Sequence, residues 1–297
     1  MGWGHMNRNA KTTNRWTVRD VLEWTASHFS DKGIPSARLD ADVLLAHALQ
    51  VDRLYLYLNL DRPLLKVERD RYRELVSRRA KREPVALITG TREFWSLPLR
   101  IAPGVLIPRP ETETLVQAVL EEIRGTDEPR VLEVGTGSGA VSIAVAKEVT
   151  AVDIVATDLD PKALEVARSN AADLGVNSSI RFLASNLLSE IQDSESFDVI
   201  CSNPPYIPTG VLETLEPEIV CFEPRLALDG GVDGLDVIRE LASRAKDFLE
   251  DTGALILEFG DDQRDAVREL LASRGRFGRI SFLEDLSGKP RVAVAKA

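Results

Sequence analysis

The sequence has few of the residues on which several large enzyme classes depend. Its three histidines, His5, His28 and His47, all lie in the first fifty positions, far from the motifs described below. This placement argues against a Ser-His-Asp triad or a histidine-rich metal site. The two cysteines, Cys201 and Cys221, show neither metal-ligand spacing nor a disulfide framework. We therefore predict no metal and a reducing, cytoplasmic location.

Long hydrophobic runs and an excess of positive charge are also missing. No apolar run approaches the ~20 residues of a membrane span, and the start has no signal-peptide core, so no membrane partner is expected. The formal net charge of −10 disfavours broad nucleic-acid binding, and no direct nucleic-acid substrate is expected. The opening residues, Met1–Met6, look like a cloning remnant.

Residues 1–83 are predicted to form a small helical domain. Thr17 precedes a first amphipathic segment, and Ser36 is placed to cap a second helix. A third segment, 67–82, holds most of a basic run, because positions 62–82 contain nine Lys or Arg against three acids. This run indicates either a solvated helix face or a surface that docks a partner that is acidic or bound to RNA.

Residues 84–110 show a different pattern. Segments 87–90 and 93–101 suggest a β-hairpin or short sheet, so we predict a hairpin and linker that join the helical domain to a domain over 111–297. The stretch Leu106–Glu113, with the sequence LIPRPETE, contains two prolines that bar helix at the residues before them. It is expected to form a rigid extended leader, with Thr112 and Glu113 opening the helix that follows.

Residues 111–297 alternate apolar strands with helical segments. This alternation predicts an α/β fold, a seven-stranded, doubly wound, Rossmann-like sheet that ends in a hairpin. The predicted strands are 130–134, 153–157, 180–184, 197–201, 254–259, 279–283 and 291–296, and the main helices are 113–123, 141–147, 163–174 and 262–273.

A glycine-rich loop, Gly135–Gly139, lies between the first of these strands and its helix. Such a loop lets a ligand approach the backbone and the N-terminus of the helix. Asp158 ends the next strand, where it can accept hydrogen bonds from ribose hydroxyls. Asn186 and Leu187 follow the third strand, near the expected place of an adenine ring. These features fit an NAD site and an S-adenosylmethionine site equally.

The fourth strand runs into Asn203-Pro204-Pro205-Tyr206. Consecutive prolines end the strand and stiffen the turn, at the sheet edge where open α/β folds bind ligands. Asn203 offers one acceptor and one NH2 group, and Tyr206 offers an aromatic ring, so the corner can hold a planar amide or amine. The alternative is a proline-rich surface turn. The long segment 223–236 that follows is interpreted as a lid.

Taken together, these motifs resemble the PrmC/HemK family of protein-(glutamine-N5) methyltransferases, which modify class I peptide-chain release factors. Asn-Pro-Pro-Tyr is shared with N6-adenine methyltransferases, whereas the LIPRPETE leader combined with an N-terminal helical domain is more specific. The resemblance covers residues 38–296 and rests on Arg92–Trp95, Leu106–Glu113, Gly135–Gly139, Asn203–Pro208, Glu223–Leu228 and Asp233–Asp236.

The resemblance implies a class I methyltransferase fold that uses S-adenosyl-L-methionine and releases S-adenosyl-L-homocysteine. It places the methionine part of the cofactor on the loop after the first strand, the ribose on Asp158 and the adenine beside Asn186, where the family commonly has aspartate. The implied cofactor-binding residues are Glu133, Gly135, Thr136, Gly137, Ser138, Gly139, Asp158, Asn186, Leu187 and Asn203.

The implied reaction methylates the side-chain amide of the glutamine in a release factor's Gly-Gly-Gln loop. Asn203 Oδ1 and the Pro204 carbonyl would hold the two N–H groups, and Tyr206 would pack on the amide. The substrate site would also include Pro205. Phe94 and Glu111 are candidates for the wall that receives the substrate loop, or else belong to the hairpin core and the start of a helix.

Four other functions remain open on the residues alone. A ribosomal-protein glutamine methyltransferase and an N6-adenine nucleic-acid methyltransferase would use the same corner. An NAD-dependent oxidoreductase would share the glycine loop but leave Asn-Pro-Pro-Tyr unexplained. A binding module without catalysis would not need Asn203.

Overall fold

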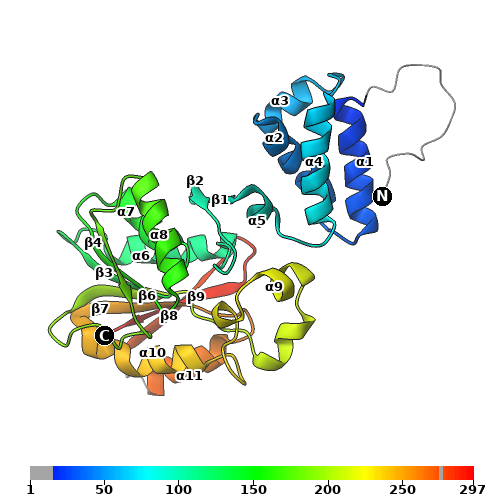
Figure 1. Cartoon of the computed structure of the whole chain (residues 1–297). Coiled ribbons are helices and arrows are strands. Elements are labelled where there is room, and N and C mark those ends of the chain that lie inside the picture. Colours follow the sequence, from blue (N-terminus) through cyan, green and yellow to red (C-terminus); the bar gives the residue numbers. More distant parts are fainter. Residues whose placement is uncertain (1–15, 274–276) are drawn as a thin grey trace, which may run out of the picture. The chain divides into compact units, whose positions relative to one another are not determined.

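The computed structural model describes residues 16–273 and 277–297, so Met1–Met6 and His5 lie outside the described residues. The chain divides between Thr89 and Gly90 into a helical unit and a sheet unit (Figure 1). Among the described residues, no helix is both long enough and apolar enough to cross a membrane.

In the helical unit, α1 packs against α2, and α2 also packs against α4. Thr17 begins α1 with reciprocal bonds: its hydroxyl accepts from the Asp20 N–H at 3.2 Å, and the Asp20 carboxylate accepts from the Thr17 N–H at 2.9 Å. Ser36 precedes α2, but its side chain makes no capping bond, so that expectation was wrong. The helices are α1 (Val18–Asp31), α2 (Ala37–Leu49), α3 (Arg53–Leu58), α4 (Lys66–Arg79) and α5 (Val85–Thr89).

The extended segment predicted at 87–90 is wrong, because these residues mostly belong to α5. The N–H groups of Leu87 and Ile88 both donate to the Pro84 carbonyl, at 3.0 and 3.1 Å. Ile88 is buried in the core of the helical unit. A short apolar run is compatible with either a strand or a helix, and here the packing of Ile88 decides for the helix.

The hairpin is formed by β1 (Thr91–Phe94) and β2 (Leu97–Arg100), which pair antiparallel. Trp95 and Ser96 turn the chain with φ of 52° and 57°, the left-handed geometry that matches strand twist in tight hairpins. The hairpin part of the prediction is therefore confirmed. The hairpin packs on α8 (Pro161–Asp173) within the sheet unit, since Asn170 of this helix accepts from the Arg100 N–H at 2.8 Å.

The main sheet has seven strands in the order β5-β4-β3-β6-β7-β9-β8, which confirms the predicted fold class. The first five are parallel, and β9 runs antiparallel to both neighbours. The strand order reverses between β3 and β6, and open α/β sheets bind their ligands at such a point. The strands are β3 (Arg130–Val134), β4 (Asp153–Asp158), β5 (Ile180–Ala184), β6 (Phe197–Ser202), β7 (Leu249–Glu258), β8 (Arg279–Glu284) and β9 (Pro290–Lys296).

Helices cover both faces of this sheet and form two apolar cores. On one face lie α6, α7 and α8, and on the other lie α10 and α11 (Figure 1). The bounds are α6 (Glu113–Glu122), α7 (Ala140–Glu148), α8 (Pro161–Asp173), α9 (Pro217–Phe222), α10 (Asp236–Arg244) and α11 (Arg264–Ser273), with 3-10 turns at Pro110–Thr112, Thr209–Thr214, Arg225–Ala227 and Ala245–Phe248.

Candidate active site

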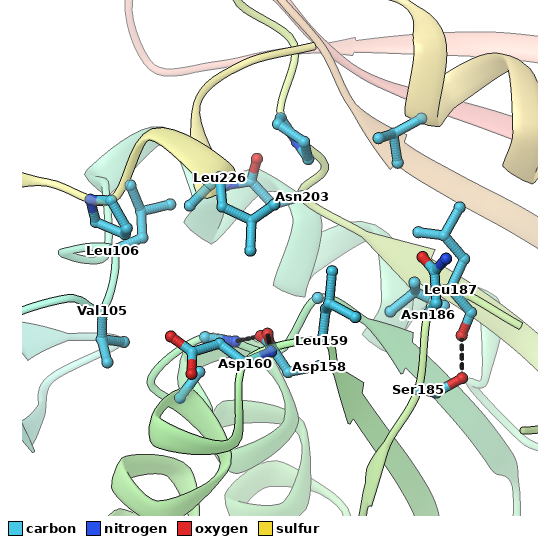
Figure 2. Close-up of a pocket in the computed structure, with 18 of the residues that line it drawn as sticks. Val105, Leu106, Asp158, Leu159, Asp160, Ser185, Asn186, Leu187, Asn203 and Leu226 are labelled. Carbon is cyan, nitrogen blue, oxygen red and sulfur yellow. Dashed lines mark hydrogen bonds between the residues drawn. The ribbon is translucent and has the colours of Figure 1, made fainter. Parts of the chain in front are cut away.

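A cavity of about 250 Å³ opens at the carboxyl ends of β3, β4, β5 and β6, where the strand order reverses. Its walls come from segments far apart in the chain, including the leader before α6 and the turn at 224–227 (Figure 2). The predicted site residues that line it are Gly135, Gly137, Asp158, Asn186, Leu187, Asn203 and Pro205.

The glycines of the loop after β3 have positive φ angles, which other residues adopt only with strain. Gly135, Gly137 and Gly139 have φ of 78°, 57° and 82°. A Cβ on Gly139 would lie 2.9 Å from Ile143 and 3.1 Å from Ala167, so this glycine also lets α7 approach α8. Gly135 has open space around it, which leaves its backbone accessible to a ligand.

Asp158 ties this loop to the end of β4. One carboxylate oxygen accepts from the Gly137 N–H at 2.8 Å, and the other accepts from the Asp160 N–H at 2.9 Å. Burial raises the pKa of the Asp158 carboxyl, and the backbone N–H donors oppose that rise. Each oxygen keeps a further lone pair, so Asp158 can still accept from hydroxyl groups in the cavity.

Glu133 lies behind the glycine loop rather than among the cavity-lining residues. One of its oxygens accepts from Thr136 Oγ1 at 2.7 Å, from the Ser142 N–H at 3.1 Å and from the Ser142 hydroxyl. Burial raises the pKa of Glu133 to about 7. Thr136, Ser138 and Gly139 belong to the loop itself but are buried and are also absent from the lining. Their direct contact with a cofactor stays a prediction.

The far end of the cavity is formed by the turn after β5. The Ser185 hydroxyl donates to the Leu187 carbonyl at 2.9 Å and holds the turn, in which Leu187 has a φ of 52° (Figure 2). The apolar side chains of Leu159, Leu187 and Val237 line the cavity. Such walls suit a flat aromatic ring, and Asn186 is exposed at the same turn.

Asn203 follows the last residue of β6 and stands across the cavity from Asp158 (Figure 2). Its side-chain NH2 donates to Thr112 Oγ1 at 3.0 Å. The amide oxygen is the remaining polar atom of the side chain and can accept a donor from a ligand. Of the two prolines that follow, Pro204 is buried and Pro205 lines the cavity.

Tyr206 is fixed by two partners on the far side of the corner. Its hydroxyl donates to Glu258 Oε1 at 3.2 Å, and its carbonyl accepts from Gln263 Nε2 at 2.9 Å. Glu258 is the last residue of β7 and is fully buried, which raises its pKa to about 7. Hydrogen bonding with Thr112 and Tyr206 and the charge of Arg291 oppose this rise.

The leader and the segment after the corner are joined by one ion pair. Arg109 Nη2 lies 2.6 Å from Glu223 Oε1, whose side chain is 2% exposed. The ion pair holds the leader against the turn at 224–227. Leu106 of the leader and the two residues before it, Gly104 and Val105, line the cavity. The segment predicted as a lid therefore forms part of the cavity wall.

Several residues that shape the site were not predicted as site residues. The sequence analysis marked the leader and the Glu-Pro-Arg-Leu-Ala-Leu motif as family motifs. These motifs could have led to the prediction of four lining residues, Leu106, Pro224, Leu226 and Ala227. Glu258 carried no local signal at all. The other unpredicted lining residues are Gly104, Val105, Val134, Leu159, Asp160, Ala163, Ser185 and Val237.

The two candidates for the substrate wall differ in their surroundings. Phe94 is 2% exposed and packs in the core cluster that contains Leu99 and Leu115. Glu111 is exposed, in the 3-10 turn near the end of the leader, directly before α6, and its charge raises the pKa of Glu258. Contact of either residue with a substrate stays a prediction.

The sheet has seven strands in this order, a glycine loop after β3 and an acidic residue at the end of β4. This is the architecture of methyltransferases that bind a nucleoside-containing cofactor. The methyltransferase small domain family matches residues 110–220, and the PrmC N-terminal domain family matches residues 20–90. A solved methyltransferase from Pyrococcus furiosus shares the fold, with a TM-score of 0.50 and 20% identity over 67% of this chain and 88% of that chain.

Two relatives narrow the class further, and both are named release factor glutamine methyltransferase. The relative from Rhodopirellula baltica is 39% identical over 95% of this chain and 98% of its own length. The one from Geobacter sulfurreducens is 42% identical over 91% of both chains. The chain belongs to the release factor glutamine methyltransferase family.

Proposed function

We propose that this protein transfers a methyl group from S-adenosylmethionine to the side-chain nitrogen of the glutamine in the Gly-Gly-Gln loop of class I release factors. The observation that carries the proposal is the state of Asn203. Its NH2 group donates to Thr112 and the residue lines the cavity, so its oxygen would be the acceptor offered to a substrate. An acceptor at that point suits a substrate that presents N–H groups.

The residues of the cavity fit the proposed cofactor. The Asp158 carboxylate keeps lone pairs for two ribose hydroxyls, and the open backbone at Gly135 and Gly137 admits close approach. The apolar side chains of Leu159 and Leu187 suit an adenine ring. When bound, S-adenosylmethionine would supply an electrophilic methyl group on a sulfonium.

The turn Asn203–Tyr206 would act by positioning the substrate amide. An amide nitrogen is a poor nucleophile because its lone pair is delocalised into the carbonyl. Asn203 Oδ1 and the backbone carbonyl of Pro204 would accept the two N–H groups and aim the nitrogen at the methyl carbon. Well-oriented pairs reach effective molarities of about 10⁵–10⁸ M. One N–H proton becomes acidic once the nitrogen carries the methyl group, and it leaves to solvent.

The same two acceptors would select glutamine over glutamate. A glutamate carboxylate has no hydrogen to offer and would face two oxygens, which leaves all of them unpaired in a partly buried site. Tyr206, held by Glu258 and Gln263, would form the wall on which the planar amide packs.

The test uses tritiated S-adenosylmethionine with the purified chain and two substrates in parallel. One substrate is an unmethylated class I release factor, and the other is a mixture of duplex and single-stranded DNA. We expect label on the release factor that disappears when its loop glutamine is replaced by alanine. Label on DNA alone would show that the corner holds an adenine amino group instead.

A further inference from the structure

The buried side chain of Asn170, in α8, makes hydrogen bonds to two segments that lie far apart in the sequence. The residue is 1% exposed. Its Oδ1 accepts from the Arg100 N–H at 2.8 Å, and its Nδ2 donates to the Arg100 carbonyl at 3.1 Å. Nδ2 also donates to the carbonyl of Ser138, in the glycine loop, at 2.9 Å. Both hydrogens of the NH2 group are therefore used.

Asn170 is the one polar residue on the buried face of α8. The other buried residues of this helix are Ala163, Leu164, Ala167 and Ala171. Burying an amide is unfavourable unless its polar groups are paired, and here they are paired on both sides. A fully satisfied buried polar group favours one arrangement of its partners over others. Asn170 therefore fixes how the hairpin and the glycine loop lie relative to each other.

The two partners of Asn170 lead directly to two walls of the cavity. Ser138 follows Gly137, which lines the cavity in the glycine loop. Arg100 ends β2, shortly before Gly104 and Val105, which line the cavity in front of the leader. Asn170 connects these two walls from behind and does not itself line the cavity.

Other bonds hold the beginning and the middle of the glycine loop. The Thr157 carbonyl accepts from the N–H groups of Gly135 and Thr136, both at 2.8 Å. The Asp158 carboxylate accepts from the Gly137 N–H at 2.8 Å. These bonds tie the loop to β4. The bond from Asn170 to Ser138 ties the end of the loop to α8 and, through Arg100, to the hairpin.

The composition of the loop makes such ties necessary. Glycine backbone populates positive and negative φ about equally, so Gly135, Gly137 and Gly139 leave the loop free to change shape unless outside bonds hold it. A loop that must be ordered when its ligand binds loses affinity, and a loop that is ordered beforehand gains it. The affinity for a ligand on this loop therefore depends on the bonds that order it.

We propose that Asn170 is a positioning residue for the cofactor. It would fix the end of the glycine loop relative to β2 and so set the spacing of the two walls between which S-adenosylmethionine binds. This inference rests on the proposed function, which supplies the cofactor. Asn170 acts through Ser138 and Arg100, so its loss should weaken cofactor binding more than substrate binding.

The first test compares Asn170→Ala, which removes all three bonds, with Asp173→Ala as the matched control. Asp173 lies on the same helix and accepts from the Arg100 guanidinium, so the control removes a side-chain link between hairpin and helix but keeps the Asn170 bonds. Calorimetry gives the Kd for S-adenosylhomocysteine, and kinetics give KM separately for S-adenosylmethionine and for the release factor. Circular dichroism and thermal unfolding establish that each variant is folded.

For Asn170→Ala we expect the Kd for S-adenosylhomocysteine and the KM for S-adenosylmethionine to rise about tenfold, the size of one buried hydrogen bond. The KM for the release factor should change less, and Asp173→Ala should keep all three values. A purely structural role would lower the unfolding temperature of Asn170→Ala without changing this Kd, and that result would overturn the inference. Equal rises in both variants would also overturn it, because they would assign the effect to the hairpin as a whole.

The shape of the loop can also be followed without any ligand. The Gly137 N–H donates to Asp158, and the Gly139 N–H donates to the Thr136 carbonyl at 2.8 Å. Hydrogen exchange of these two amides, measured by NMR, reports local opening of the loop. Both should exchange about tenfold faster in Asn170→Ala and at the unmodified rate in Asp173→Ala. Unchanged exchange in Asn170→Ala would show that Asn170 does not hold the loop.

A second variant covers the case in which Asn170→Ala does not fold. Asn170→Asp keeps the volume and the oxygen that accepts from Arg100, but it loses both donated bonds, so the same results are expected of it. If neither folds, the unmodified chain decides. Addition of S-adenosylhomocysteine should slow exchange of the Arg100 N–H, which donates to Asn170. An Arg100 exchange rate that the bound ligand leaves unchanged would contradict the proposed link.

The outcomes separate this inference from the proposed function. If the unmodified chain does not bind S-adenosylhomocysteine, the proposed function fails, and exchange of the loop amides still decides whether Asn170 holds the loop. If the unmodified chain binds it and labels the release factor, while Asn170→Ala keeps both its Kd and its loop exchange, only the role of Asn170 fails.

Discussion

Asn203 combines a fixed donor side with a free acceptor side, and this division leads to a simple mutational test. Asn203→Ala removes the acceptor without disturbing the glycine loop or Asp158. We expect the variant to fold and to bind S-adenosylhomocysteine with a Kd close to that of the unmodified chain. Its kcat should fall by about 100-fold or more, as when one positioned polar group is lost from an active site. Full activity in this variant would contradict the mechanism.

The burial of Glu133 should make the free energy of unfolding depend on pH. Its pKa is raised to about 7 in the folded chain, against an ordinary value of 4.5. Folding therefore favours the protonated form, and stability from this group is lost as pH rises from 4.5 through 7. The full effect is about 3 kcal/mol.

We accordingly predict that Glu133→Gln gains stability relative to the unmodified chain as pH rises. A glutamine oxygen can still accept from Thr136 and Ser142, and it carries no charge to bury. Urea unfolding at pH 5 and pH 8 measures the difference in the free energy of unfolding between the two chains. A difference that is the same at both pH values would show that the raised pKa of Glu133 is wrong.

Single residues were predictable where a strand end fixed their position. Asp158 and Asn203 each follow an apolar run, and parallel strands bring their carboxyl ends to one edge of the sheet. Thr112 and Glu258 could not be placed in this way. Thr112 lies 91 positions from Asn203, and Tyr206 lies 52 positions from Glu258, so only the folded chain shows these contacts.

At the scale of elements, the leader and the turn at 224–227 form neighbouring parts of the cavity wall, and the Arg109–Glu223 ion pair joins them. Arg109→Ala would leave the Glu223 carboxyl buried without its cation. Burial already raises the pKa of Glu223, and Arg109 lowers it. Without Arg109 the pKa of Glu223 rises further, so the variant should lose more stability at pH 8 than at pH 5.

The expected loss at pH 8 is about 1–3 kcal/mol, below the value for a fully buried pair because Arg109 is about one-third exposed. Denaturant unfolding at the two pH values measures it. The double variant Arg109→Ala, Glu223→Gln removes the unpaired charge and should recover most of the loss at pH 8. Equal losses at both pH values would mean that the pair does not hold the two walls together.

Helices and strands were easier to predict where the apolar pattern in the sequence was longer. The strands of the sheet were predicted from runs rich in apolar residues, and all seven are present. The apolar run at 87–90 is too short to show a period, and it belongs instead to helix α5, whose first turn donates to the Pro84 carbonyl. The wall at 224–227 has little regular structure. Its motif could therefore be noticed in the sequence, but its position beside the cavity could not be predicted.

For the whole molecule, the two units have separate cores and separate family matches. The basic run of the helical unit is heavily paired inside that unit: Arg62, Lys66, Arg73, Arg78 and Arg79 all form ion pairs with nearby acids. Much of its positive charge is therefore paired within the unit, although the exposed pairs contribute little stability each. That the helical unit docks the substrate protein stays a prediction.

This prediction can be tested by separating the units, because the cavity belongs wholly to the sheet unit. Residues 90–297 alone should bind S-adenosylhomocysteine as the full chain does and should methylate a short Gly-Gly-Gln peptide at the same rate. A whole release factor offers a second contact surface, and losing such a contact lowers effective affinity by about 100-fold or more. We expect kcat/KM for the release factor to fall by that factor in residues 90–297 while the peptide value is unchanged. An equal kcat/KM for the release factor in both forms would assign all recognition to the sheet unit.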